Sequence, residues 1–254
     1  MDAAIFQSIE TKKWDPVFLA LWRDNNLAAV RSKRDGELPL HNIFRHNGSF
    51  PSVRLLESLL EAFPDAVRER TSDGDLPLHL ALYSYSSIKI IRLLITAYPE
   101  SAAERNKYGN LPLHCALRNN LNIEIITIIL DSYPQGAYER DEANWLPLHI
   151  VLKADAPREN VISILLERCP DLAKEKDFGG ELPLHYSLRK SSISLDTVRV
   201  IFNAFPDAVH ETNPNVLHLA FARQVPFDFL KMLIKMLDGD SIDNEESEDD
   251  ISIM

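Results

Sequence analysis

Leu38-Pro39-Leu40-His41 is the first of five copies of one tetrapeptide in this chain of 254 residues. The other copies lie at residues 76–79, 111–114, 146–149 and 182–185, and a variant, Asn-Val-Leu-His, lies at 215–218. The six histidines, at positions 41, 79, 114, 149, 185 and 218, are therefore separated by 38, 35, 35, 36 and 33 residues. A period of this length is typical of stacked-repeat proteins, in which each unit buries its apolar face against its neighbours.

Each tetrapeptide is predicted to begin a short helix, because proline is favoured at the first helical position, where its missing N–H costs no hydrogen bond. A second apolar run follows after a polar break. In residues 88–98 its polar members are Lys89, Arg92 and Thr96, whose spacing by three and four places them on one stripe of a helix. The aromatic-proline pair Tyr98-Pro99 ends this helix, since the residue before proline disfavours the α region. One unit is thus helix, turn, helix and an extended finger loop.

The unit resembles the ankyrin repeat family, whose pattern of about 33 residues contains Asp-x-x-Gly-x-Thr-Pro-Leu-His followed by two helices. Residues 106–114 read Asn-Lys-Tyr-Gly-Asn-Leu-Pro-Leu-His, and residues 141–149 read Asp-Glu-Ala-Asn-Trp-Leu-Pro-Leu-His. The resemblance covers about residues 14–237 and implies an all-α solenoid of about six to seven repeats.

The chain departs from the family pattern in two ways. Leucine stands where the family has threonine before proline in five copies, which removes a side-chain cap and a partner for the histidine. The second helix is expected to run about two residues longer and to end in aromatic-proline, where the family usually has glycine.

Three segments are expected along the chain. Residues 1–30 are predicted to form a divergent N-terminal capping repeat with helices at 2–10 and 15–25, because a terminal repeat faces water on one side. Residues 31–237 carry the ankyrin-type repeats. Residues 238–254 contain eight acidic residues and no basic ones, which predicts an acidic, disordered tail. Such a tethered tail is expected to compete with acidic partners for a basic groove.

The composition favours an intracellular protein. Hydrophobic residues make up 45% of the chain, enough for a continuous core. Cys115 and Cys169 cannot form a disulfide framework and fit small core positions, so we expect a reducing compartment, cytoplasmic or nuclear. Residues 1–10 lack the basic and apolar regions of a signal peptide. No run approaches the roughly 18 apolar residues of a membrane helix, so no membrane insertion is expected.

Six histidines at one repeat position raise the question of a metal site. Packed helices lie about 8–10 Å apart, whereas each ligand of a zinc ion lies about 2 Å from it. We therefore expect no metal and interpret these histidines as structural residues that hydrogen-bond loop backbone between repeats. They are His41, His79, His114, His149, His185 and His218. The chain has no glycine-rich phosphate loop, no Gly-x-Ser-x-Gly elbow and no Cys-x-x-Cys, so neither a cofactor nor catalysis is expected.

Basic residues recur at two repeat positions that ankyrin-like folds place on the concave side. The first column follows the short helix and comprises Arg45, Tyr83, Arg118, Lys153, Arg189 and Arg223. The second column precedes the finger turn and comprises Arg70, Arg105, Arg140 and Lys176. These columns predict a surface for an acidic or mixed peptide. The alternative is that the cations offset helix dipoles or pair with Glu69, Glu104, Glu139 and Glu175.

Three successive finger loops carry an aromatic residue: Tyr108, Trp145 and Phe178. Exposed aromatic side chains dominate binding hot spots, so these three are candidate partner contacts. The alternative is that each ring packs onto the adjacent finger.

These features predict a non-catalytic, monomeric protein–protein interaction module or scaffold. It would present a rigid concave groove and finger loops to a partner protein or peptide, so little conformational entropy would be lost on binding. Alternatives are a nucleic-acid-binding solenoid and a regulatory fragment of a larger enzyme complex. The net charge is −11, of which the repeats hold only about −3 once the eight acidic tail residues are set aside. Nucleic-acid binders are usually strongly basic, so this alternative is disfavoured.

Overall fold

The computed structural model describes residues 2–11, 13–45, 52–211 and 215–237. The expected acidic tail lies outside these residues. The described residues form α-helices and short 3-10 helices joined by turns and finger loops. The chain divides into two compact units, residues 1–169 and 170–254. The all-α repeat fold predicted from the tetrapeptide is confirmed.

The first unit contains five helix pairs. It opens with α1 (Asp2–Glu10) and α2 (Trp14–Arg23), close to the bounds predicted for the capping repeat. The pairs that follow are α3 (Pro39–Asn42) with α4 (Val53–Ala62), α5 (Pro77–Tyr83) with α6 (Ile88–Ala97), α7 (Pro112–Arg118) with α8 (Ile123–Ser132), and α9 (Pro147–Lys153) with α10 (Glu159–Arg168). In the second unit, α11 (Pro183–Arg189) pairs with α12 (Leu195–Ala204), and α13 (Val216–Ala222) pairs with α14 (Phe227–Leu237).

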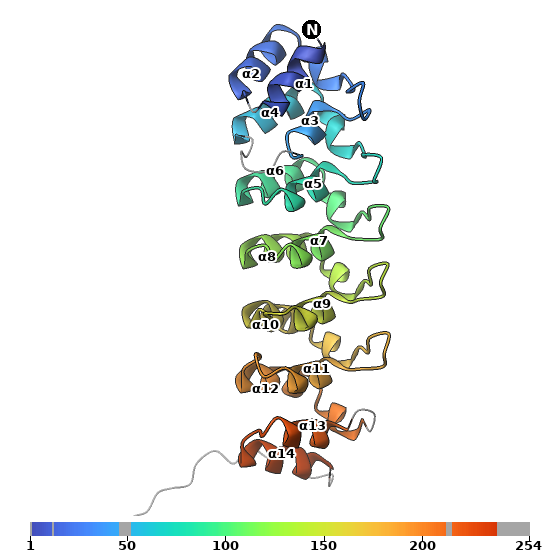
Figure 1. The fold of residues 1–254 in the computed structure, drawn as a ribbon, viewed down its shortest axis with the longest axis vertical. Helices are drawn as coiled ribbons and strands as arrows, with labels where there is room; N and C mark the ends of the chain where they lie inside the picture. The colour runs from blue at the N-terminus through green and yellow to red at the C-terminus, as the bar shows by residue number, and fades with distance from the viewer. Residues whose placement is uncertain (1, 12, 46–51, 212–214, 238–254) are drawn as a thin grey trace, which may run out of the picture. The chain divides into compact units, whose positions relative to one another are not determined.

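Within the first unit the helices stack in two layers. The short helices α5, α7 and α9 lie side by side, and α6, α8 and α10 lie side by side behind them (Figure 1). The second leucine of each tetrapeptide is buried between the layers, as Leu78, Leu113 and Leu148 show. The second helices supply the facing side chains, such as Ile91 and Ile126. In the second unit, α11 contacts both α12 and α13 in the same way.

The two proline steps of each repeat act as the sequence predicts, with one addition. Pro39, Pro77, Pro112, Pro147 and Pro183 each occupy the first position of a short helix. The second helices end one residue earlier than the residue that precedes the other proline, and that residue leaves the helical region, with φ −146° and ψ 84° at Tyr98. That proline then begins a five-residue 3-10 helix: η2 (Pro64–Arg68), η3 (Pro99–Ala103), η4 (Pro134–Tyr138), η5 (Pro170–Lys174) and η6 (Pro206–His210). The sequence analysis missed these elements, although proline's fixed φ favours a helix start there too.

The finger loops at residues 106–110 and 141–145 are each closed by a side-chain cap and a left-handed residue. Asn106 Oδ1 accepts a hydrogen bond from the Asn110 N–H (3.0 Å), and Asp141 Oδ1 accepts one from the Trp145 N–H (2.8 Å). The turn residue has positive φ and is glycine in most fingers, for example +72° at Gly74. Successive fingers also contact each other through backbone, because the Lys107 N–H donates to the Asp73 carbonyl (3.1 Å).

The finger contact predicts different outcomes for two glycines that have the same φ of +72°. A Cβ on Gly36 would meet nothing within 4 Å, whereas a Cβ on Gly74 would lie 2.9 Å from the Lys107 amide nitrogen. Gly36→Ala should therefore cost only the left-handed strain, about 1–2 kcal/mol. Gly74→Ala should cost more, because the next finger must also move. Urea-unfolding midpoints of the two variants test this, and equal losses would contradict a close finger contact.

Candidate functional site

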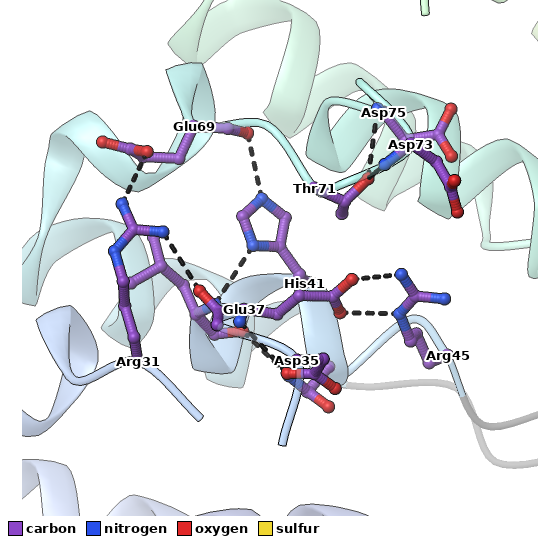
Figure 2. Close-up of polar contacts among 12 residues, drawn as sticks. Arg31, Asp35, Glu37, His41, Arg45, Glu69, Thr71, Asp73 and Asp75 are labelled. Carbon is purple, nitrogen blue, oxygen red and sulfur yellow. Dashed lines mark hydrogen bonds and ion pairs between the residues drawn. The ribbon is translucent and has the colours of Figure 1, made fainter. Parts of the chain in front are cut away.

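Five of the six repeat histidines are fully buried: His41, His79, His114, His149 and His185. The Leu38 N–H, at the start of α3, donates to Nδ1 of His41 (3.2 Å). Because Nδ1 accepts, the ring proton lies on Nε2, which donates to the Glu69 carbonyl of the next repeat (2.9 Å; Figure 2). The equivalent Nδ1 bonds join Leu76 to His79, Leu111 to His114 and Leu182 to His185, and the equivalent Nε2 bonds reach Asn110 from His79 and Glu139 from His114.

In α3, α5, α7 and α11 the histidine thus compensates for the missing threonine by accepting a hydrogen bond from the backbone N–H at the start of the short helix. The Nδ1 lone pairs of His41, His79, His114 and His185 are engaged in these bonds. Within the described residues, no group of three or more His, Cys, Asp or Glu is placed to hold a metal ion. His218 differs from the other five because it is exposed in the last described repeat, so the structural role predicted for it does not extend to that copy.

The second basic column forms clamps between fingers. Arg70 donates to the Gly74 carbonyl of its own finger (2.7 Å) and to the Arg105 carbonyl of the next (2.8 Å). It also pairs with Glu104. Arg105 repeats this pattern with Gly109, Arg140 and Glu139. Arg31, one repeat earlier than Arg70, pairs with Glu69 in the same way (Figure 2). The remaining members also have partners: Arg140 donates to the Asn144 carbonyl and Lys176 pairs with Glu211.

The first column contacts the bases of the fingers. Arg45 pairs with Glu37 and Arg189 with Glu181, each eight residues back in its own repeat. Arg118 instead pairs with Asp141 of the next finger. The Tyr83 hydroxyl accepts a hydrogen bond from Asn106 Nδ2 (3.0 Å), and Lys153 Nζ lies 3.3 Å from the centroid of the Trp145 ring. Arg223 donates to the Ser187 and Ile193 carbonyls. These contacts give the members of both columns partners within the chain, and the acidic partner expected for them stays a prediction.

The three finger aromatics have different environments. Phe178 is 86% exposed and Tyr108 is 49% exposed, with Lys107 Nζ 5.0 Å from the Tyr108 ring centroid. Trp145 is half-buried: its ring meets His149 edge-on at 6.5 Å between centroids, and Lys153 lies on its face. The ring of Trp145 therefore packs within the chain, although on His149 and Lys153 and not on the adjacent finger, whereas Phe178 and Tyr108 remain available to a partner.

Two exposed aromatics outside the fingers were missed by the repeat analysis. Trp22 on α2 is 83% exposed, and Phe227 at the start of α14 is 77% exposed. Helical periodicity could have indicated Trp22, because it lies off the face that buries Val17 and Leu21.

The helix pairs, finger loops and histidine links define an all-α repeat protein. Residues 52–139 match a family model described as ankyrin repeats (3 copies). Residues 52–139 therefore carry ankyrin repeats, as their tetrapeptide pattern predicted. No curated protein matches it. None of the described helices is long and apolar enough to cross a membrane.

Solved structures share this fold. An ankyrin repeat domain from Acinetobacter baumannii AYE is 17% identical with a TM-score of 0.65, over 80% of this chain and 98% of that one. Another ankyrin repeat protein is 15% identical with a TM-score of 0.63, over 81% of this chain and 98% of that one.

The histidine links predict a specific pH dependence of stability. Burial lowers the pKa of His114 to about 4, from about 6.5 in an unfolded chain. As the pH falls, the unfolded state binds the proton first, so the stability due to neutral His114 is complete above about pH 6.5 and is lost between about 6.5 and about 4. His114→Asn should cost about 1–3 kcal/mol at neutral pH. The difference from wild type should shrink by up to about 3 kcal/mol as the pH falls to about 4.

Urea unfolding of wild type and His114→Asn at a series of pH values measures this difference. His218→Asn, at the exposed copy, is the matched control and should follow wild type throughout. A difference between wild type and His114→Asn that stays constant with pH would contradict the neutral, buried histidine link.

The hydrogen bonds of Arg105 predict that a positive charge alone does not maintain the stability of the chain at this position. Arg105→Lys keeps the positive charge but cannot reach Gly109, Arg140 and Glu139 together, because an ammonium group lacks the planar fork of a guanidinium. We expect a loss of about 1 kcal/mol in the free energy of unfolding, measured by urea denaturation. Unchanged stability would mean that the interfinger bonds contribute nothing and that the side chain is free for another role.

Proposed function

We propose that this chain is a non-catalytic interaction module that binds a partner protein through the exposed tips of its finger loops. Ankyrin repeats are generally protein–protein interaction modules. The observation that carries the proposal for this chain is Phe178, a large apolar ring that is 86% exposed at a finger tip. Covering such a ring would contribute about 1.5–3 kcal/mol to binding.

The finger that carries Phe178 is held in one conformation. The Asp177 N–H donates to the Glu181 carbonyl (2.9 Å), and the Asp177 carbonyl accepts from the Gly180 N–H (3.0 Å). The Asp177 carboxylate also accepts from the Glu181 N–H (2.9 Å). Gly180 supplies the left-handed turn, with φ +79°. A ring on such a fixed turn loses little conformational entropy when a partner covers it. Tyr108 occupies the tip of an equivalently capped finger in the first unit.

The reactive groups of the first unit support a role without catalysis. The thiol of Cys115 is buried, and burial raises its pKa to about 12, so it is not a nucleophile at neutral pH. His79 and His114 have both ring nitrogens in hydrogen bonds to backbone. Cys115 and Cys169 are unbridged, which supports the proposal of a reducing, intracellular compartment. We propose that the module acts as a monomer.

The proposal predicts that Phe178→Ala weakens partner binding without unfolding the chain. The partner would be captured from the native cell with the full chain and identified by crosslinking mass spectrometry. Affinity for it should fall by about 2 kcal/mol, close to 30-fold, while the melting temperature stays unchanged. Trp22→Ala removes an equally exposed ring outside the fingers and should bind normally. Trp145→Ala should instead lower stability. Normal binding by Phe178→Ala would place the contact elsewhere.

A further inference from the structure

One acidic position of the repeat follows a pairing rule. The residue just before the tetrapeptide is acidic in three repeats, as Glu37, Asp75 and Glu181. In two of them an arginine stands eight residues later and pairs with it: Arg45 with Glu37 (Figure 2) and Arg189 with Glu181. The fold therefore has a fixed geometry for a guanidinium against this carboxylate.

Asp75 has no such arginine. Tyr83 stands eight residues after it and supplies no positive charge. Asp75 is only 6% exposed, and Asn106 Nδ2 donates to its Oδ1 at 2.8 Å. Among the described residues, no cation lies within ion-pair distance of this carboxylate. Burial raises the pKa of Asp75, and the Asn106 hydrogen bond and the charges of Arg45 and Lys107 offset this only in part, which means that its charged form would gain from a further cation.

A cavity of about 230 Å³ opens beside Asp75. It is lined by Phe44, Arg45, Asp75, Leu80, Tyr83 and Ser84. The Arg45 guanidinium is neutralised by its two bonds to Glu37, and the Ser84 hydroxyl is engaged with the Ala81 carbonyl and Ser86. The charge of the cavity is therefore set by Asp75, within walls that are otherwise aromatic and aliphatic.

We propose that this cavity receives an arginine side chain from a partner protein. Its guanidinium would pair with Asp75 as Arg45 pairs with Glu37, while its aliphatic stem lies against Phe44 and Leu80. Arginine fits better than lysine, because its planar fork can bind a carboxylate through two parallel bonds and can stack on the Tyr83 ring. The inference rests on the proposed function, since it names a chemical feature of the partner, but it uses a different surface from the finger tips.

The test uses the full chain and a probe that needs no knowledge of the partner. Nα-acetyl-arginine amide would be titrated into ¹⁵N-labelled protein, and its neutral isostere, Nα-acetyl-citrulline amide, would serve as the ligand control. We expect the arginine probe to shift the amide signals of Asp75, Tyr83 and Ser84, and the citrulline probe to leave them unchanged.

Three variants examine the role of charge. Asp75→Asn should weaken the arginine probe at least tenfold. Tyr83→Arg restores the pairing rule inside the chain, so it should abolish probe binding and raise the urea-unfolding midpoint. Glu142→Gln removes an exposed carboxylate from another finger and should bind the probe as wild type does.

Equal shifts with arginine and citrulline would overturn the proposal, as would wild-type probe binding by Asp75→Asn. Should Asp75→Asn fail to fold, Tyr83→Arg decides: wild-type probe binding by this variant overturns the proposal. If the arginine probe does not bind while Phe178→Ala still lowers the affinity for the partner, the arginine cavity is contradicted and the finger-tip contact is not. Probe binding with no effect of Phe178→Ala would leave the cavity intact and contradict the finger-tip contact.

Discussion

A neutral imidazole ring joins repeats within the first unit, and several features of the fold depend on it. Nδ1 of His114 must accept from the start of its own helix while Nε2 donates to the Glu139 carbonyl of the next repeat. A protonated ring would have no acceptor for the Leu111 N–H. Burial keeps the ring neutral and thereby fixes both the helix start and the position of the following finger. This double role explains why the histidine recurs with the repeat period.

The arginines of the second column connect successive fingers, in addition to the histidine links between repeats. The guanidinium groups of Arg70 and Arg105 each donate to carbonyls of two fingers and pair with one glutamate. Their contribution depends on geometry, since exposed ion pairs alone contribute little. The fingers of the first unit are thus connected through side chains and, at Lys107 and Asp73, through backbone.

Local sequence rules predicted most of the helices, whereas side-chain contacts between residues distant in the sequence were not predicted. The two proline steps located the short helices and the ends of the long ones. The partner of Arg70, by contrast, is 34 residues away, and its choice depends on the rise between repeats, which one sequence does not give. The sequence-based prediction treated Trp145 and Phe178 alike, although Trp145 directly precedes its tetrapeptide and Phe178 stands four residues before its own. Only the structure shows that His149 and Lys153 cover the ring of Trp145.

Repetition makes departures from the pattern informative. Where a repeat keeps the rule, as with Glu37 and Arg45, the polar side chains satisfy each other and leave little for a partner to bind. Where it breaks the rule, as with Tyr83 opposite Asp75, a buried carboxylate is paired with the Asn106 amide and with no arginine. Stability constrains the first kind of position, because removing one partner of a buried pair strands the other. The second kind contributes no arginine pair to stability, so it is the position at which we propose that an arginine of a partner binds.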